Sequence, residues 1–227
     1  MMKNWILYED NHLIIVNKPP KIPVQGDRTG DLSLIDIAKK YIKERDKKPG
    51  NVFMGLPHRI DRPTSGIVVL SKTSKSLSRM TKIFKERRVK KVYWAIVKKK
   101  LHKDQATLIN FLKKNQIKNK SFASKDKKNG FLKSELNYHF KQKIDSYYLY
   151  EVELITGRHH QIRAQFSYAG SPIKGDVKYG ANAPNKNGSI HLHSRNIEFK
   201  HPVNDKTINI TASPPKKEII WRNCFKN

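Results

Sequence analysis

The stretch that decides the fold is HRIDRPTSGIVVL, residues 58–70, in which a charged segment runs directly into an apolar one. Residues 67–70 form a short apolar run typical of a buried strand. Pro63 restricts the backbone before this strand, and Gly66 permits a turn. Asp61 stands between two arginines, and nearby positive charge lowers the pKa of an acid. We therefore expect an ionised carboxylate that a loop presents.

Such a carboxylate could act as a nucleophile or as a general base. Local spacing alone favours a simpler interpretation, an ordinary Arg–Asp ion pair that stabilises a turn. The choice between the two depends on the rest of the chain.

The hydrophobic pattern on both sides of this stretch predicts several strands with a few helices between them. Because the strands come in runs without regular βαβ alternation, the pattern favours an α+β domain with a mostly antiparallel sheet. Strands are predicted at residues 5–8, 13–16, 67–70, 91–97, 132–140, 147–155, 189–199 and 207–211, and helices from residue 33 to the stop at 47–50, at 74–87 and at 160–169.

The composition favours a polyanionic partner. The 227 residues include 47 Lys and Arg against 19 Asp and Glu, which gives a formal charge of +28. Nucleic acid is the leading partner class, since basic groups release counterions when they neutralise phosphates. The Lys-rich segment 113–130 predicts an exposed loop rather than a domain linker. No apolar run approaches the roughly 20 residues of a membrane helix, so we expect no membrane association.

A second polar cluster, TGRHHQIR at residues 156–163, precedes the third predicted helix. If His160 begins that helix, Arg163 lies one turn later and can project toward a phosphate or a carboxylate. A zinc site is not expected here, because His159 and His160 would point to different faces and no Cys pair accompanies them. Cys224 is the single cysteine of the chain.

Taken together, these motifs resemble the RluA-type family of RNA pseudouridine synthases. The resemblance covers nearly the whole chain, and its motifs occur in the family's order. They are the opening hairpin with Asn17-Lys18-Pro19, the Asp motif at residues 58–66, the tyrosine segment at 91–95, the Arg motif at 157–163 with Gly175-Asp176 and Tyr179-Gly180, and the closing segments at 191–194 and 199–202.

The resemblance implies the pseudouridine synthase catalytic fold, an α+β fold whose mostly antiparallel mixed sheet is flanked by helices and loops. It implies that Asp61 is the essential carboxylate, which attacks the ribose or removes a ribose proton. Arg163 would be the ionic partner of Asp61, and Tyr93 would stack on the uracil. Arg62 would fill the space that a flipped base leaves in an RNA stem.

Two further cations, Arg158 and Lys174, are expected to contact RNA phosphates and to set the register of binding. The implied reaction isomerises specific uridines to pseudouridine in structured RNA, in ribosomal or transfer RNA stem-loops. It needs no cofactor and no metal, because it involves no redox change.

We expect a single catalytic domain over residues 1–227, without an N-terminal RNA-binding module. We also expect a cytoplasmic monomer with no obligate protein partner. The alternative from another class is a non-catalytic RNA-binding or ribosome-assembly protein with the same fold, because fold alone does not establish activity.

Overall fold

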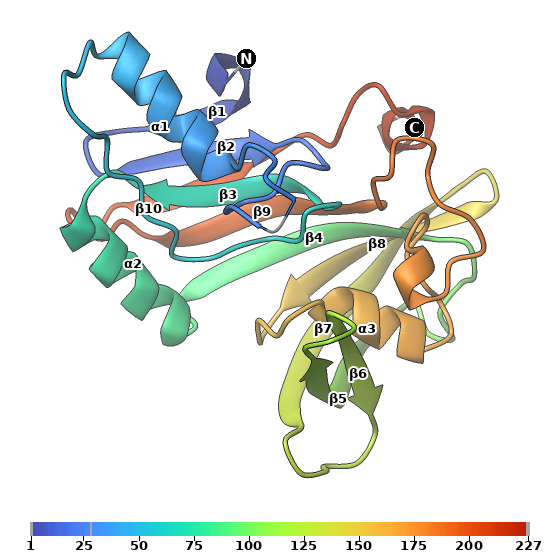
Figure 1. The fold of residues 1–227 in the computed structure, drawn as a ribbon. Coiled ribbons are helices and arrows are strands. Elements are labelled where there is room, and N and C mark those ends of the chain that lie inside the picture. Colours follow the sequence, from blue (N-terminus) through green and yellow to red (C-terminus); the bar gives the residue numbers. More distant parts are fainter. Residues whose placement is uncertain (1, 28, 226–227) are drawn as a thin grey trace. The chain divides into compact units, whose positions relative to one another are not determined.

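The computed structural model describes residues 2–27 and 29–225, and these form two compact units (Figure 1). Unit 1 comprises the residues up to Lys90 together with Ser194–Pro214. Unit 2 comprises Lys91–His193 together with the residues from Pro215 onward. The expectation of one catalytic domain over the whole chain therefore concerns both units, and it stays a prediction.

Unit 1 is built on strands that pair in the order β1, β2, β3 and β9, with β10 on β9. The pairs β1–β2, β2–β3 and β9–β10 are antiparallel. Its elements are the 3-10 helix η1 (Met2–Trp5), β1 (Ile6–Glu9), β2 (Leu13–Lys18), α1 (Leu34–Arg45), β3 (Ser65–Ser71), α2 (Ser74–Lys85), most of β9 (Leu192–Lys200) and β10 (Thr207–Thr211).

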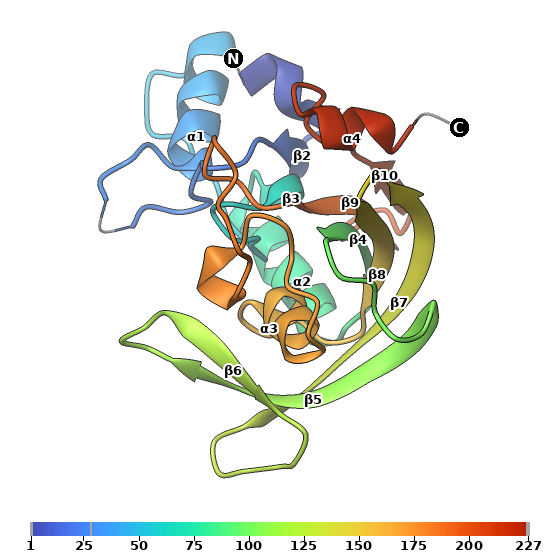
Figure 2. The same ribbon diagram turned by 90° about the vertical axis from the view of Figure 1, so that its right-hand side faces the viewer.

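Unit 2 contains an antiparallel run of strands in the order β4, β8, β7, β5 and β6. Figure 2 shows α3 beside the long β5–β6 hairpin of this unit. Its elements are most of β4 (Val89–Val97), β5 (Gln105–Asn115), β6 (Lys120–Ser124), β7 (Leu132–Ile144), β8 (Tyr147–Leu154), α3 (Gln161–Tyr168), η2 (Val177–Tyr179) and α4 (Ile219–Asn223).

The α+β prediction with a mostly antiparallel sheet is confirmed. The helix expected from residue 33 begins with the capping box that its sequence indicates, because Ser33 and Asp36 cap each other's backbone N–H groups. The segment at 113–130 differs from the expected loop. It contains the end of β5 and the whole of β6, and paired lysines on an exposed strand explain why hydrophobic periodicity did not reveal it.

The core of unit 1 lies on both faces of its sheet, and α1 and α2 lie on opposite sides of β2 and β3 (Figure 1). Every residue of β3 is buried, as expected for a strand that is covered on both faces. The face toward α2 is formed by alternate strand residues and by two residues of the helix: Leu13, Ile15, Ile67, Val69, Met80, Ile83, Ile197 and Phe199.

Two clusters of buried residues in unit 2 join its helices to its strands. The first joins α4 to β4 and β8 and consists of Trp94, Ile96, Ile144, Leu149, Trp221 and Cys224. The second joins α3 and η2 to β5 through Leu112, Ala164 and Tyr179. Next to the latter, the ring of Phe166 meets the rings of Tyr138 and Tyr150 edge to face. Both helices of the unit therefore bury one apolar side against its strands.

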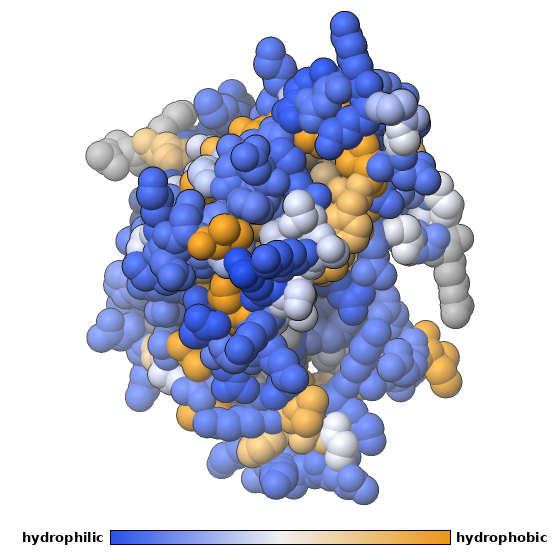
Figure 3. All heavy atoms as spheres, turned by 90° about the vertical axis from the view of Figure 1, so that its left-hand side faces the viewer, coloured by the Kyte–Doolittle hydropathy of each residue, from blue (hydrophilic) through white to orange (hydrophobic). Residues whose placement is uncertain are grey.

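Hydrophilic residues cover most of the molecular face in Figure 3, with hydrophobic atoms in separate small groups. No helix among the described residues is long and apolar enough to cross a membrane.

Gly66 is the second residue of β3 and lies where the backbone of unit 1 is unusually crowded. It has a φ of +109°, and a Cβ added there would lie 2.3 Å from the carbonyl oxygen of Ser194. Both the conformation and the close approach require a residue without a Cβ. The turn that carries Asp61 therefore runs into β3 at a position that only glycine can occupy without strain.

We predict that Gly66→Ala lowers the free energy of unfolding by about 2 to 4 kcal/mol, because it adds left-handed backbone strain and a clash with fixed backbone atoms. Urea denaturation measures this change. The matched control is Gly50→Ala, since Gly50 has an ordinary φ and no atom within 4 Å of an added Cβ. Equal urea midpoints for the two variants would contradict the prediction.

Candidate active site

Asp61 lies in a tight turn immediately before β3, in unit 1. The N–H of Thr64 donates to the carbonyl oxygen of Asp61 at 3.0 Å, which closes the turn around Arg62 and Pro63. Thr64 is buried, whereas Asp61 is half-buried. The turn is thus fixed at its C-terminal end and presents the carboxylate at its other end, as the sequence predicted.

Lys18, at the end of β2, connects this turn to the N-terminal strands. Its side chain is fully buried, and its ammonium donates to the carbonyl oxygens of Pro19 and Ile22 at 3.0 Å each and of Arg62 at 3.2 Å. The N–H of Lys21 also donates to the carbonyl of Arg62, at 2.8 Å. Two donors, one at the end of β2 and one just after it, therefore hold the peptide between Arg62 and Pro63.

Two features of the surroundings of Lys18 shift its pKa in opposite directions. Burial lowers the pKa of Lys18 from its ordinary value of 10.5 to about 7, and the charge of Asp61 partly opposes this shift. Since the attraction is mutual, the ammonium of Lys18 favours the ionised form of Asp61. The sequence indicated arginines as the cations near Asp61, and Lys18 adds a buried one.

His58 fixes the start of the Asp motif to β3. Its Nε2 accepts a hydrogen bond from the N–H of Val69 at 2.9 Å, so the proton of the neutral ring sits on Nδ1. The imidazole also stacks on Phe84 of α2, with the ring centroids 4.4 Å apart. These contacts give His58 a positioning function in the motif.

Arg62, which follows Asp61, extends from the turn with its side chain 38% exposed. Its guanidinium contacts Lys21, Thr29 and Asp31 of the same unit. Asp61, Arg62 and Lys18 therefore belong to one unit, and the structure builds their surroundings from β2, β3 and the segments that follow β2 and precede β3.

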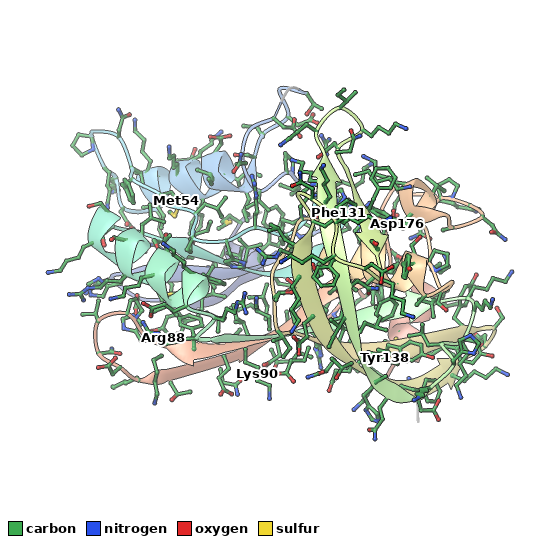
Figure 4. All side chains as sticks on the ribbon, turned by 90° about the horizontal axis from the view of Figure 1, so that it is seen from below. Met54, Arg88, Lys90, Phe131, Tyr138 and Asp176 are labelled. Carbon is green, nitrogen blue, oxygen red and sulfur yellow. The ribbon has the colours of Figure 1, made fainter. Side chains whose placement is uncertain are left out.

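Arg163 lies on α3 in unit 2, where its guanidinium forms a two-point ion pair with Asp176. Nε donates to Oδ2 at 2.6 Å and Nη2 donates to Oδ1 at 2.9 Å, and both side chains are buried. Figure 4 labels Asp176. The guanidinium also lies 4.9 Å from the ring centroid of Tyr179. Asp176 thus holds the planar guanidinium at its edge and Tyr179 packs on its face, and the two contacts fix its orientation.

The two neighbouring histidines stack on each other, contrary to the expectation that they point apart. Their ring centroids are 3.7 Å apart. The cause is the backbone of His160, which caps α3 with a φ of 52° instead of forming its first turn. The Nδ1 of His160 and the hydroxyl of Tyr179 are 2.9 Å apart. His160 thus supports the same tyrosine that packs against Arg163.

Tyr93 lies on β4, on the sheet face of unit 2 that α3 covers. It pairs directly with Val152 of β8, and Val152 pairs with Tyr138 of β7. Directly paired residues share a face, and the ring of Tyr138 contacts Phe166 of α3. The structure therefore places Tyr93 and Arg163 on the same side of the unit 2 sheet.

The two cations expected at phosphates are both half-buried in unit 2. The Nε of Arg158 donates to the carbonyl of Lys133 at 3.1 Å. Lys174 donates to Asn185 at 2.5 Å, and burial lowers the pKa of Lys174. Lys174 lines a cavity of about 260 Å³ together with Asn185, Lys186, Asn187, His191, Glu218, Ile219 and Ile220. The proposed phosphate contacts of both residues stay predictions.

Two residues near these groups escaped the sequence analysis as functional residues. Lys18 and Asp176 occur in quoted motifs, but neither received a role. The sequence did hold a signal for Asp176, because it is a lone acid in a Lys-rich region, 13 positions after Arg163. Among residues 2–27 and 29–225, no group of three or more His, Cys, Asp or Glu side chains could hold a metal ion.

Comparison with known proteins identifies a common family. A family model described as RNA pseudouridylate synthase matches residues 12–168. The chain is 38% identical to ribosomal large subunit pseudouridine synthase C of Buchnera aphidicola subsp. Acyrthosiphon pisum, over 92% of this chain and 67% of the relative. It is 32% identical to the protein of the same name from Rickettsia prowazekii, over 95% and 69% of the two chains.

Solved structures share the fold. Human RNA Pseudouridylate Synthase Domain Containing 4 superposes with a TM-score of 0.80 at 22% identity, over 97% of this chain and 92% of that one. Human RNA Pseudouridylate Synthase Domain Containing 1 gives a TM-score of 0.71 at 22% identity, over 93% and 83% of the two chains.

The low pKa of Lys18 predicts a dependence of stability on pH. In the unfolded chain Lys18 keeps its proton to about pH 10, whereas the folded chain releases it near pH 7. The unfolded state thus binds more protons between these values, so stability rises with pH in this window. We expect the free energy of unfolding of the native chain to rise between pH 7 and pH 9 relative to that of Lys18→Met.

Urea denaturation at several pH values measures this difference. Lys40→Met is the matched control, since the side chain of Lys40 is 76% exposed, and its curve should run parallel to that of the native chain. A difference between the native chain and Lys18→Met that does not change with pH would contradict the prediction.

Proposed function

The chain belongs to the RNA pseudouridylate synthase family, and we propose that it isomerises uridine to pseudouridine with Asp61 as the essential carboxylate. One observation supports this most directly. The segment that the family model matches, residues 12–168, includes the turn that presents Asp61 beside the buried ammonium of Lys18. Tyr93 and Arg163 also lie within it. Family membership supports the enzyme over the non-catalytic alternative.

The reaction breaks the bond between ribose C1′ and N1 of uracil, turns the base and joins C1′ to C5. N1 gains a proton, and C5 loses one to solvent. Attack on the ribose and removal of a ribose proton both require an ionised carboxylate. The charge of Lys18 favours that state of Asp61 in either case.

We assign the supporting roles to unit 2. Arg163 would pair with Asp61 during the reaction, while Asp176 and Tyr179 keep its guanidinium oriented. Bidentate orientation of this kind suits arginine and would not survive replacement by lysine. Tyr93 would stack on the uracil and assist the loss of the C5 proton.

For the substrate we propose a structured segment of large-subunit ribosomal RNA. The support is that relatives 31 to 38% identical to this chain are named ribosomal large subunit pseudouridine synthase C. Transfer RNA is the second expectation. A paired uridine cannot reach a protein carboxylate from inside a stem, so it must be flipped out or presented from a loop. The monomer and the cytoplasmic location stay predictions.

The β5–β6 hairpin and the segment after it supply a surface suited to RNA. Residues 113–133 include eight lysines and one acid, Asp126. Phe122 pairs across the strands with Lys113, so the two share a face, and the phenyl ring of Phe122 is 42% exposed. The ammonium of Lys113 also lies 6.0 Å from the ring centroid of Phe131, which Figure 4 labels. Bases can stack on an exposed ring such as that of Phe122 while lysines contact phosphates.

We predict that Asp61→Asn lowers turnover by about a thousandfold or more, since loss of a nucleophile or base removes the reacting group. The measurement is tritium release from RNA labelled at uridine C5, with RNA from a strain that lacks this gene. Asp46→Asn is the control, because it removes one acid elsewhere in unit 1, where Asp46 pairs with Arg45. Substantial turnover by Asp61→Asn, with RNA binding intact, would refute the assignment.

We predict that replacing Lys118, Lys125, Lys127 and Lys128 by alanine flattens the salt dependence of RNA binding. Each lost phosphate contact should reduce the slope of log Kd against log salt by roughly 0.7 to 0.9. The control replaces four exposed lysines of unit 1, namely Lys39, Lys40, Lys43 and Lys48, and so removes the same charge. Equal slopes for the two variants would exclude a specific contribution of the hairpin.

A further inference from the structure

A small acidic segment of unit 1 surrounds the guanidinium of Arg62. Nε donates to the carbonyl of Lys21 at 2.9 Å, and Nη1 donates to the hydroxyl of Thr29 at 3.0 Å. Nη2 donates to Asp31, and Nη1 lies 3.5 Å from Asp27. All three nitrogens of Arg62 therefore have partners within the protein.

Thr29 joins the two carboxylates into one network. Its hydroxyl lies 2.5 Å from Asp27 and 2.8 Å from Asp31, and its N–H donates to Asp27 at 2.9 Å. Contacts with Thr29, and then with Arg62, lower the pKa of both Asp27 and Asp31. Both acids therefore carry their charge at neutral pH, and the network includes two negative charges around one cation.

Acids are scarce in this chain, with 19 against 47 basic residues, yet two of them meet the arginine next to Asp61. Exposed ion pairs add little stability, so stabilising the fold is a weak reason for this placement. The same weakness makes the pairs easy to exchange. A polyanion that approaches Arg62 competes directly with Asp27 and Asp31 for the guanidinium.

We propose that Asp27, Thr29 and Asp31 hold Arg62 in the RNA-free enzyme, and that RNA must displace the two carboxylates before Arg62 can contact it. Asp31 and Thr29 are then positioning residues that act through Arg62. The proposal rests on the role proposed for Arg62 in filling the space left by a flipped base. RNA that gives the guanidinium of Arg62 a good new partner compensates for the broken ion pairs. RNA that gives it no such partner does not compensate for them. The acidic segment thus lowers the affinity for RNA that engages Arg62 and leaves binding that does not engage Arg62 unchanged.

The test compares Asp31→Asn with Asp46→Asn, because removal of any acid strengthens RNA binding through net charge alone. Asp46 is also exposed, belongs to unit 1 and pairs with a different arginine, Arg45. The probes are an in vitro transcript of large-subunit ribosomal RNA and an unstructured oligouridine. Loss of one exposed pair converts to a gain of about two- to fivefold in affinity.

We expect Asp31→Asn to bind the transcript about two- to fivefold more tightly than Asp46→Asn does. We also expect Asp31→Asn and Asp46→Asn to bind oligouridine equally, because oligouridine has no stem in which Arg62 could fill a vacated space. In an Arg62→Ala background the extra gain from Asp31→Asn should disappear, and Asp31→Glu should restore native affinity. Equal affinities for Asp31→Asn and Asp46→Asn, or a gain that persists without Arg62, would overturn the proposal.

Tritium release by the same variants separates this proposal from the proposed function. Under the proposal, Asp31→Asn lowers KM for the transcript and leaves kcat near native, a split that a purely structural role of Asp31 would not produce. Absence of release by the native chain, together with the affinity pattern above, would refute the enzymatic function while supporting the acidic network. Tritium release by the native chain, together with equal affinities of Asp31→Asn and Asp46→Asn, would support the enzymatic function and refute the acidic network.

Discussion

The arrangement around Asp61 depends on the ammonium group of Lys18. Carbonyl oxygens of Pro19, Ile22 and Arg62 converge on it from two segments that are far apart in sequence. Oxygens with partial negative charge repel one another unless a donor lies between them, so the path of the turn depends on the donor that Lys18 supplies. Lys18 also pairs with Gly66 in the β2–β3 ladder, and the strand register therefore sets where the ammonium lies.

Unit 2 fixes its own cation by the opposite electrostatic means. Arg163 is neutralised by the carboxylate of Asp176 in a buried two-point pair, whereas Lys18 is held by neutral carbonyl dipoles. A buried charge without a partner is costly, so loss of Asp176 would leave Arg163 in an unfavourable environment. The neutral environment of Lys18 lowers its pKa, and its charge is correspondingly open to titration near neutral pH.

Sequence reasoning located the elements whose apolar residues follow a clear period. The buried β3, the capped α1 and the strand β10 all lie where the pattern indicated them. It missed β5 and β6, because the segment that contains the end of β5 and all of β6 is rich in lysine, asparagine and serine, which are typical of loops. The short helix α4 was missed too, since five residues are too few for a helical period to emerge.

The same limit applies to the candidate site. The family resemblance implied Asp61 as the essential carboxylate, whereas the local residue types alone favoured an ion pair that stabilises a turn, so the catalytic role stays a prediction. The contacts that hold it could not be predicted, because they involve backbone carbonyl oxygens such as that of Arg62, which no side-chain pattern encodes. The stacking of His159 on His160 depends likewise on one left-handed backbone angle.

The division of the chain into units has a consequence for folding during translation. Unit 1 is completed by residues 194–214, which supply Ile197, Phe199 and Ile208 to its core, and unit 2 is completed by Trp221 and Cys224. A nascent chain that has reached residue 193 therefore lacks part of both cores. Domains usually fold as units as they emerge from the ribosome, N-terminal first. Here neither unit can close early, and its exposed apolar strands must be kept from aggregating until the last segment has been synthesised.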